Sequence, residues 1–434
     1  MLFFGGSVTS LKGVVMVEKK KIRIEETGEK RRGRLSNFTS MLKKSVTLEI
    51  AAKAKQMNEH GQNVISFSAG EPDFDTPYSI KEAAKRAIDE GKTKYTDASG
   101  IKELKAAIRQ KFMRENNLHY DENMIIVSAG AKYALFAVLA AITSPGDEVI
   151  LPVPFWVSYP SLIQLTGGTP VFTYPSEERD FRLTLDDIKK VVSERTKAII
   201  INSPNNPSGA VYRTGDLEAI VNFCVERNIM VISDEIYEKL VYDNVQHVSL
   251  ASIVDEKSRR NIVVINGVSK AYAMTGWRIG YAAGPRDIIE RMKFFVAHTT
   301  SNPNTIAMWA AVEALNGSQN QVEMMTRKFN RRRQFMYDEI MKVPHLKCTY
   351  PVGAFYMFVN FKHYINCTIN GHRIESTLDL ANYMLDEANV ATVPGESFGL
   401  PGYIRFSYAT SMDNIAEGID NMKAALADVE FDDE

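Results

Sequence analysis

One pattern repeats along the middle of the chain, from about residue 123 to residue 284. A short apolar run rich in β-branched residues leads into a polar turn, and a helical segment follows. Because the apolar runs are continuous rather than alternating, they indicate parallel strands of an α/β sheet covered by helices on both faces. Ligands of such sheets bind outside the carboxyl ends of the strands, so we expect functional residues in the turns that follow the runs. The runs are Met124–Val127, Asp147–Leu151, Lys197–Ile201, Ile229–Ser233 and Ile262–Ile265.

The flanking segments follow other patterns. Two charged or mixed stretches are predicted to be helical, Ile101–Asn116 and Thr305–Met341. Two later stretches are predicted to be strands, Gly353–Phe358 and Gly402–Ser407.

A chain of 434 residues is too long for one hydrophobic core. We expect a large domain over residues 81–320. A smaller α+β domain is expected from both ends of the chain, residues 35–80 and 321–434. Residues 1–34 are expected to be a separate N-terminal extension.

This extension resembles no targeting signal. It begins mildly apolar but has no basic n-region and no convincing cleavage site, so a signal peptide is not expected. We expect a disordered arm, or translation that begins at Met16. A polyanion-binding tail is the alternative, because Lys19–Lys21 and Arg31–Arg32 lie in this segment.

Composition excludes several classes of function. The net charge is −1, with 45% hydrophobic and 24% charged residues, which argues against a nucleic-acid-binding or polybasic membrane surface. The cysteines Cys224, Cys348 and Cys367 are scattered, so neither a disulfide framework nor a zinc site is expected, which fits a reducing cytoplasm. The apolar stretch Ala134–Ile142 is far shorter than the ~20 residues that span a bilayer. We expect a cytoplasmic protein without metal, membrane or nucleic-acid partners.

Lys270 follows the apolar run Ile262–Ile265, with Ser269 beside it and Arg278 eight residues later. A lysine in such a turn can hold an aldehyde as a Schiff base while the neighbouring hydroxyl and guanidinium hold a phosphate. The alternative is a solvated surface lysine.

The turn Ser128–Lys132 contains small residues between a predicted strand and a helix. Free backbone N–H groups at the start of a helix can bind an anion. The alternative is a plain tight turn. Neither standard nucleotide motif competes with this turn, because the chain has no GxGxxG and Gly91–Thr93 lacks the leading glycine of a P-loop.

Asp234 directly follows a predicted buried strand, and buried aspartates are rare unless paired. It could serve as the counter-ion of a protonated ring nitrogen, or cap a helical segment Glu235–Leu240. Tyr237 would project from the same side of that segment. Asn206 lies in an Asn-Asn-Pro-Ser-Gly cluster that either forms an ordinary loop or holds an amide toward a phenolate oxygen.

Two further side chains have open interpretations. Trp156 follows another strand and offers a flat face for stacking, or belongs to the core. Arg405 lies within an apolar strand, where a guanidinium needs an anionic partner. That partner is either an internal carboxylate or the carboxylate of a substrate.

Taken in order, these pieces resemble the fold-type I aminotransferases that use pyridoxal 5′-phosphate (PLP). The resemblance covers residues 35–428, and its most specific motifs are Ser203–Gly209, Ser233–Tyr237 and Ser269–Gly280. The segment Ala69–Pro77 resembles the bacterial-type aspartate aminotransferase branch, which includes prephenate aminotransferases. The resemblance implies a large PLP-binding domain with a mostly parallel seven-stranded sheet, and a smaller α+β domain.

It also implies roles for individual residues. Lys270 would be the Schiff-base lysine, and Asp234 the partner of the ring nitrogen. The other cofactor-binding residues would be Gly130, Ala131, Ser269 and Arg278 at the phosphate, Asn206 and Tyr237 at the ring oxygen, and Trp156 on the ring face. Tyr95 would reach the phosphate of a neighbouring subunit, which implies a homodimer with shared active sites. Arg405 and the backbone of Gly70 would bind the α-carboxylate of the substrate, assisted by Asn206 and flanked by Trp156.

The side chain of the substrate would be read by Lys132, Ser45 and Thr47, which match this branch. Thr299–Asn304 contains no arginine of the kind that other aspartate aminotransferases use. The chain departs from related patterns at Lys44, where a proline is common, and at Gly267, where another branch has a serine.

The implied reaction is ping-pong transamination between aspartate or glutamate and a 2-oxo acid, 2-oxoglutarate or oxaloacetate. Lys270 would need a lowered pKa to act as the base. Asp234 and Tyr237 are the other residues expected to be catalytic. Alternatives are transamination of prephenate or aromatic amino acids, a PLP-dependent β-lyase, and a PLP-sensing regulator without catalysis. The 34-residue extension is too short for the DNA-binding domain of such a regulator.

Overall fold

The computed structural model describes residues 46–431. The N-terminal extension 1–34, Lys44 and Ser45 lie outside the described residues. Among the residues described, no helix combines the length and the apolar character needed to cross a membrane.

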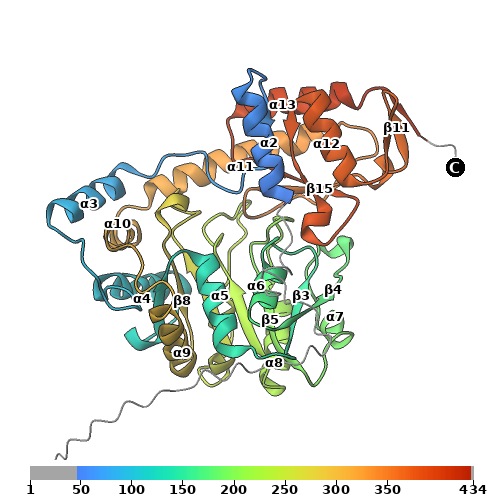
Figure 1. Cartoon of the computed structure of the whole chain (residues 1–434). Helices are drawn as coiled ribbons and strands as arrows, with labels where there is room; N and C mark the ends of the chain where they lie inside the picture. Colours follow the sequence, from blue (N-terminus) through green and yellow to red (C-terminus); the bar gives the residue numbers. More distant parts are fainter. Residues whose placement is uncertain (1–45, 432–434) are drawn as a thin grey trace, which may run out of the picture. The chain divides into compact units, whose positions relative to one another are not determined.

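The centre of the fold is a seven-stranded sheet with the strand order β2-β8-β7-β6-β5-β3-β4 (Figure 1). All neighbouring strands are parallel except for β8, which runs antiparallel to both β2 and β7. The strands are β2 (Ile125–Ser128), β3 (Glu148–Pro152), β4 (Thr169–Thr173), β5 (Thr196–Asn202), β6 (Met230–Asp234), β7 (Ile262–Gly267) and β8 (Gly280–Ala283). The mostly parallel sheet expected from the sequence is confirmed.

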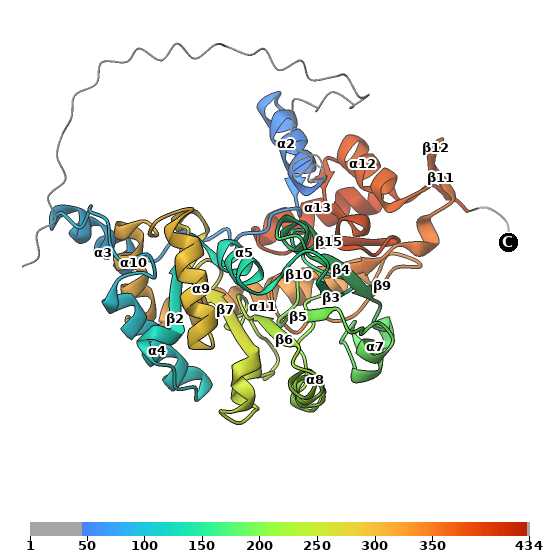
Figure 2. The same ribbon diagram turned by 60° about the horizontal axis from the view of Figure 1, so that its bottom comes forward.

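Apolar residues on both faces of these strands explain why helices cover both faces of the sheet (Figure 2). In β5, Ile199 and Ile201 join one buried cluster, whereas Ala198 and Ile200 join the other. The first cluster includes α3 (Tyr78–Asp89), α4 (Lys102–Asn116), α7 (Leu185–Lys189), α8 (Thr214–Glu226) and α10 (Thr305–Asn316). The second includes α5 (Ala131–Ile142), α6 (Tyr159–Leu165) and α9 (Arg286–Ala297).

A further buried cluster forms mainly from the C-terminal third of the chain and the segment around Phe67. It packs an antiparallel sheet with the order β14-β15-β10-β9 against helices. A three-stranded sheet, β12-β11-β16, and the pair β1-β13 lie in the same part of the chain, and α2 packs in a small cluster of its own with Val64, Leu385 and Ala391. The elements of this part of the chain are α2 (Val46–Glu59), β1 (Ile65–Ser66), α11 (Asn320–Ile340), β9 (Lys347–Cys348), β10 (Tyr356–Asn360), β11 (Cys367–Ile369), β12 (His372–Ile374), α12 (Thr377–Ala388), β13 (Val390–Ala391), β14 (Val393–Pro394), β15 (Tyr403–Ser407), α13 (Met412–Ala425) and β16 (Val429–Glu430). The segment before α3 joins this part of the fold because β1 pairs in parallel with β13.

Three predicted elements differ from the structure. The single helix expected over Thr305–Met341 is two helices, α10 and α11, because the backbone becomes extended at Gly317. The strand expected over Gly353–Phe358 begins only at Tyr356, since Ala354 has a left-handed φ of 57°. The segment after Asp234 is a turn rather than a helix.

Candidate active site

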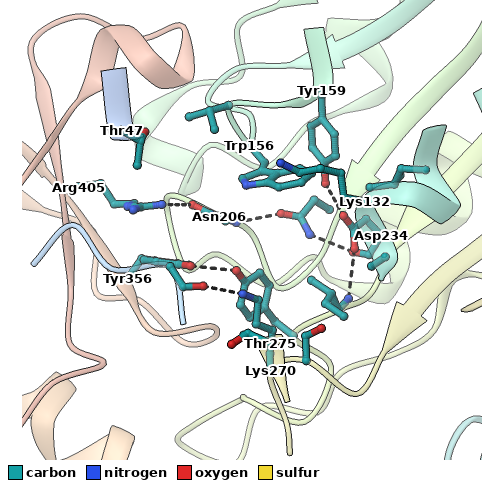
Figure 3. A pocket seen from close by; sticks show the side chains of 18 of the residues that line it. Thr47, Lys132, Trp156, Tyr159, Asn206, Asp234, Lys270, Thr275, Tyr356 and Arg405 are labelled. Carbon is teal, nitrogen blue, oxygen red and sulfur yellow. Dashed lines mark hydrogen bonds between the residues drawn. The ribbon is translucent and has the colours of Figure 1, made fainter. Parts of the chain in front are cut away.

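Most of the residues singled out from the sequence line one cavity of about 300 Å³. The cavity lies at the ends of β5, β6 and β7 and is also lined by Arg405 of β15 and Thr47 of α2 (Figure 3). The predicted residues that line it are Thr47, Gly70, Ala131, Lys132, Trp156, Asn206, Asp234, Tyr237, Ser269, Lys270, Arg278 and Arg405. The parallel strands bring these turns together because their carboxyl ends share one edge of the sheet.

Lys270 follows β7, and its Nζ donates a hydrogen bond to the carbonyl oxygen of Gly70 at 2.5 Å. Burial lowers the pKa of the amine to about 8; Arg278 and Arg405 also lower it, against the attraction of Glu71 and Asp234. A substantial fraction of the amine is therefore neutral near pH 8, and a neutral amine can act as a nucleophile or base.

Asp234 is the last residue of β6 and is buried. Its Oδ2 accepts a hydrogen bond from the Tyr159 hydroxyl at 2.7 Å, and its Oδ1 accepts one from the backbone N–H of Ile236 at 3.3 Å. Burial raises the pKa of the carboxyl to about 6, although both hydrogen bonds oppose this rise. A cation placed against Asp234 would recover the cost of burying the charge, so the carboxylate suits a protonated ring nitrogen.

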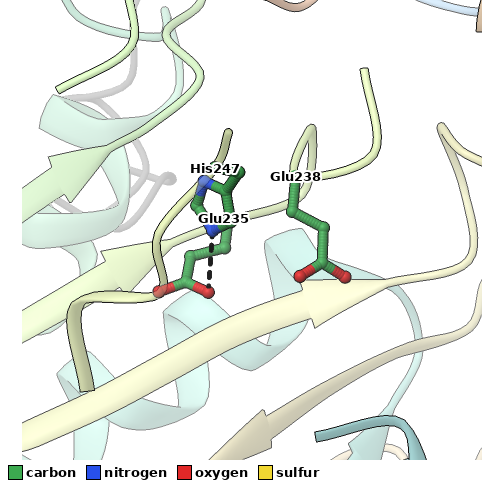
Figure 4. A group of neighbouring side chains, drawn as sticks. All are labelled: Glu235, Glu238 and His247. Carbon is green, nitrogen blue, oxygen red and sulfur yellow. Dashed lines mark hydrogen bonds and ion pairs between the residues drawn. The ribbon is translucent and has the colours of Figure 1, made fainter. Parts of the chain in front are cut away.

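A separate group of polar side chains, Glu235, Glu238 and His247, lies at the turn that follows β6 (Figure 4). Glu235 accepts hydrogen bonds from the Ser249 hydroxyl at 2.9 Å and from His247 Nε2 at 3.3 Å. Glu238 lies against the buried ammonium of Lys111. Burial raises the pKa of Glu238, but Lys111 and His247 outweigh it and bring the value to about 2. These side chains are close enough to hold a metal ion, yet the Lys111 ammonium already supplies the cation beside Glu238.

Arg405 reaches the cavity from β15 and lies opposite Asp234 in Figure 3. Its Nη1 donates to Asn206 Oδ1 at 3.0 Å and its Nη2 donates to the carbonyl oxygen of Ser68 at 2.8 Å. The guanidinium also lies 4.4 Å from the ring centroid of Tyr356. Among the described residues its buried Nε has no hydrogen-bond partner. A buried guanidinium with donor capacity in reserve is suited to a carboxylate.

The Tyr237 hydroxyl lies 3.0 Å from the Tyr356 hydroxyl. Burial, together with the nearby Tyr356, raises the pKa of Tyr237 well above its ordinary value. Tyr237 therefore stays protonated and can donate a hydrogen bond into the cavity.

Another wall of the cavity combines the N-terminus of α5 with the guanidinium of Arg278. Gly130 precedes α5 with a φ of 89°, and a Cβ at this position would overlap the Arg278 guanidinium. Arg278 is exposed, and its Nη1 donates to the carbonyl oxygen of Thr275 at 2.8 Å. Ser269 lines the same cavity. Backbone N–H groups at the start of a helix, a hydroxyl and a guanidinium form a site for an anion such as a phosphate.

Lys132 and Trp156 also meet at this wall. The Lys132 ammonium lies 4.9 Å from the ring centroid of Trp156. Burial lowers the pKa of Lys132, and the nearby Arg278 lowers it further. The hydroxyl of Thr47, across the cavity, is buried and has no hydrogen-bond partner among the described residues.

Three predicted residues are not placed in the cavity lining. Gly130 immediately precedes the lining residue Ala131, Tyr95 does not line the cavity and is 91% exposed, and Ser45 lies outside the described residues. Sequence reasoning missed Tyr159, Tyr356 and Asn202, which line the cavity. Asn202 is the last residue of β5, and its Oδ1 accepts a hydrogen bond from the backbone N–H of Asn206 at 2.9 Å. Its position at the end of a predicted strand could have identified it as a site residue from the sequence.

Comparisons with known proteins agree with this arrangement. Residues 62–422 match the family model of class I and II aminotransferases. The chain is 46% identical to an aspartate aminotransferase of Bacillus sp. (strain YM-2), covering 89% of this chain and 98% of that protein. It is also 46% identical to a probable aspartate/prephenate aminotransferase of Aquifex aeolicus, covering 91% and 99%. The crystal structure of an aspartate aminotransferase from Rhizobium meliloti superposes with a TM-score of 0.88 at 40% identity, covering 92% of this chain and all of that one. The chain therefore belongs to the class I and II aminotransferases, the PLP-dependent family that its motifs resemble.

Proposed function

We propose that this enzyme transfers the amino group of aspartate or glutamate to 2-oxoglutarate or oxaloacetate. The observation that carries the proposal is the placement of two cationic side chains, Arg405 and Lys132, in the same cavity as Lys270. A dicarboxylic amino acid has two anionic groups for those two cations. Relatives named aspartate aminotransferase support this choice of substrate.

The cavity fits PLP. Asp234 is a buried carboxyl whose raised pKa favours a cationic partner, and Trp156 offers a ring face. The N-terminus of α5 together with Arg278 suits the phosphate, because Gly130 leaves the space that a Cβ would fill. When bound, PLP supplies an aldehyde for the Lys270 amine and a ring that withdraws electrons from the substrate Cα.

The protein groups would then divide the work. Lys270 would take the proton from the substrate Cα and pass it to the carbon that PLP supplies as its aldehyde, and its lowered pKa permits both steps. Asp234 would hold the proton on the ring nitrogen, and Asn206 and Tyr237 would donate hydrogen bonds to the ring oxygen. Arg405, with the backbone of Gly70, binds the α-carboxylate and so orients the Cα–H bond for removal.

Specificity for an acidic side chain is assigned to Lys132 and Thr47. Lys132 supplies the charge, and the Thr47 hydroxyl is buried without a partner that would compete for it. Ser45 is proposed to assist them.

We propose that the enzyme acts as a homodimer. Tyr95 is 91% exposed between α3 and α4, although it carries a large aromatic ring. A partner subunit whose phosphate site receives Tyr95 would explain this exposure. The test pairs Lys270→Ala with Tyr95→Phe in hybrid dimers. If Tyr95 acts across the interface, one site per hybrid regains wild-type affinity for PLP; if it acts within its own subunit, neither site does.

The division into a large domain over residues 81–320 and a small one from residues 35–80 and 321–434 is also proposed. It is supported by a buried cluster formed mainly by residues 325–426 with Ile65 and Phe67, to which the turn after β6 adds Ile236, Tyr237, Leu240 and Tyr242.

A panel of amino donors tests the function. With 2-oxoglutarate as acceptor, kcat/KM for aspartate should exceed the values for alanine and phenylalanine. Borohydride reduction of the PLP-loaded enzyme, followed by peptide mapping, should place the label on Lys270. Preference for phenylalanine as the amino donor, or for prephenate as the acceptor, would replace the proposed substrate. Release of pyruvate and ammonia would indicate a β-lyase instead.

A further inference from the structure

A segment from the N-terminal side of α3 lies against the turn that carries the reactive lysine. The Thr275 hydroxyl donates to Glu71 Oε2 at 2.6 Å, and the Lys270 amine donates to the carbonyl oxygen of Gly70 at 2.5 Å. The Thr76 hydroxyl donates to the carbonyl oxygen of Ala273, also at 2.6 Å. Glu71 is thus hydrogen-bonded to Thr275 in the turn that carries Lys270. The neighbouring residue, Gly70, accepts a hydrogen bond from the Lys270 amine.

The negative charge of Glu71 also favours the protonated form of the Lys270 amine. Glu71, Lys270 and Thr275 line one opening beside the main cavity. The charged groups that act on the amine are Glu71 and Asp234, which attract its proton, and Arg278 and Arg405, which repel it. The rings of Tyr237 and Phe355 lie with their centroids 6.0 Å from Nζ.

Ligand binding changes the balance among these charges. A bound phosphate would neutralise Arg278, and the α-carboxylate of a substrate would neutralise Arg405. A protonated ring nitrogen would offset the charge of Asp234. Glu71 differs from these groups, because in the described part of the chain its carboxylate is held by a neutral hydroxyl rather than by a cation. Its charge therefore remains effective at Lys270 in the loaded site.

We propose that Glu71 is a positioning residue for proton transfer: its carboxylate holds Gly70 against Lys270 and supplies the negative charge that helps the amine to retain its proton. The inference rests on the proposed function, in which Lys270 must both accept and release a proton. A group that does both works best with a pKa near the operating pH. Burial alone moves the amine away from its protonated form, and Glu71 opposes that effect.

The test separates the charge of Glu71 from its hydrogen bond. Glu71→Gln removes the charge but keeps an oxygen that can accept from Thr275. Thr275→Val removes the donor but keeps the charge. Asp75→Asn is the matched control, because Asp75 is an exposed carboxylate on the same segment, 97% exposed at its side chain.

The measurement is the pH dependence of acetylation of Lys270 by acetic anhydride, followed by peptide mass spectrometry. It is made on the full-length chain with and without pyridoxamine 5′-phosphate, conditions in which the lysine amine is free. Glu71→Gln should move the midpoint to lower pH by about half to one unit, a modest shift because Glu71 is exposed. Thr275→Val should move it in the same direction by less, and Asp75→Asn should leave it unchanged.

An unchanged midpoint in Glu71→Gln would overturn the proposal. Glutamine keeps the hydrogen bond from Thr275, so the result would show that the negative charge of Glu71 does not act on the amine. A shift caused equally by Asp75→Asn would also overturn it, since any nearby charge would then suffice. Because labelling requires no turnover, this outcome is independent of the donor panel. A wild-type chain that failed to transaminate would contradict the proposed function without altering the midpoint.

Discussion

Arg405 in β15 donates from Nη1 to Oδ1 of Asn206, in the loop that follows β5, at 3.0 Å. The two residues lie 199 positions apart in the chain. Asn206 is itself fixed by Asn202, whose Oδ1 accepts from the Asn206 backbone N–H at 2.9 Å. The central sheet thereby orients a guanidinium that belongs to a different sheet. If Arg405 binds the substrate α-carboxylate as proposed, the direction of that carboxylate is set by the contact between β15 and the loop after β5.

Replacing Arg405 by lysine should lower kcat/KM for every amino donor by about 100- to 1,000-fold, or about 3–4 kcal/mol. Lysine keeps a positive charge but loses the fork of donors that holds Asn206 and the α-carboxylate together. Steady-state kinetics with aspartate and alanine measure the effect. Arg195→Lys is the control, because Arg195 is an exposed arginine that pairs with the buried carboxylate of Glu148, and neither residue lines the cavity. Wild-type kcat/KM in Arg405→Lys would exclude the proposed role.

The buried carboxyl of Asp234 predicts an unusual dependence of stability on pH. Folding raises its pKa from 3.8 to about 6, so the folded state holds the proton more tightly than the unfolded state. This contribution to the free energy of unfolding is fully present below about pH 4 and is lost as the pH rises through 6. Without cofactor, Asp234→Asn should therefore be more stable than the wild type by about 1–3 kcal/mol at pH 8.

Urea titrations at pH 4 and pH 8 measure this difference, which should shrink at the lower pH. Asp420→Asn serves as the control, since Asp420 is an exposed carboxylate at the surface of α13, 76% exposed at its side chain. If Asp234→Asn were less stable than the wild type at pH 8, the carboxylate would be stabilised in the folded state by contacts other than those described.

The sequence was sufficient to place Asn206, Asp234 and Lys270 near one another. Each follows an apolar run, and the corresponding strands β5, β6 and β7 are neighbours in the sheet. Strands buried on both faces appear in the sequence as continuous apolar runs, so they can be predicted from the sequence alone. The carboxyl ends of parallel strands share one edge of the sheet. The family resemblance added the individual roles, including that of Arg405, which no local pattern places beside Asn206.

Other features depend on tertiary contacts that a local pattern does not contain. Tyr159 and Tyr356 occur in apolar surroundings, so their sequence context is typical of core aromatics, and only the fold brings their hydroxyls to Asp234 and Tyr237. The break between α10 and α11 is different, because Asn316, Gly317 and Ser318 form a local helix-ending signal that the expected single helix does not take into account. The role inferred for Glu71 likewise requires knowing that Thr275 lies against it.

Gly130 provides a test of the phosphate site. Alanine there would combine a strained backbone at φ 89° with overlap of its Cβ and the Arg278 guanidinium. We expect a loss of about 1–3 kcal/mol in the free energy of unfolding and a weaker affinity for PLP, because Arg278 must move. Urea denaturation and equilibrium titration with PLP measure the two effects.

The variant Gly146→Ala separates the effect of backbone strain from the effect of displacing Arg278. Gly146 also has a positive φ, 97°, but a Cβ there would meet open space. This variant should lose stability while keeping its affinity for PLP. Equal losses of PLP affinity in both variants would show that backbone strain, rather than the position of Arg278, controls binding.

Lys132 and Thr47 should determine the preference for acidic donors. Lys132→Ala should lower kcat/KM for aspartate by about 10- to 100-fold while leaving the value for alanine nearly unchanged, because alanine has no distal carboxylate. Thr47→Val should act in the same direction by less, since it removes one neutral hydroxyl that is buried without a partner among residues 46–431. The comparison with Arg405→Lys is decisive, because that variant should affect both donors alike. If Lys132→Ala lowered both values equally, Lys132 would support the cofactor through Trp156 and would not select the substrate.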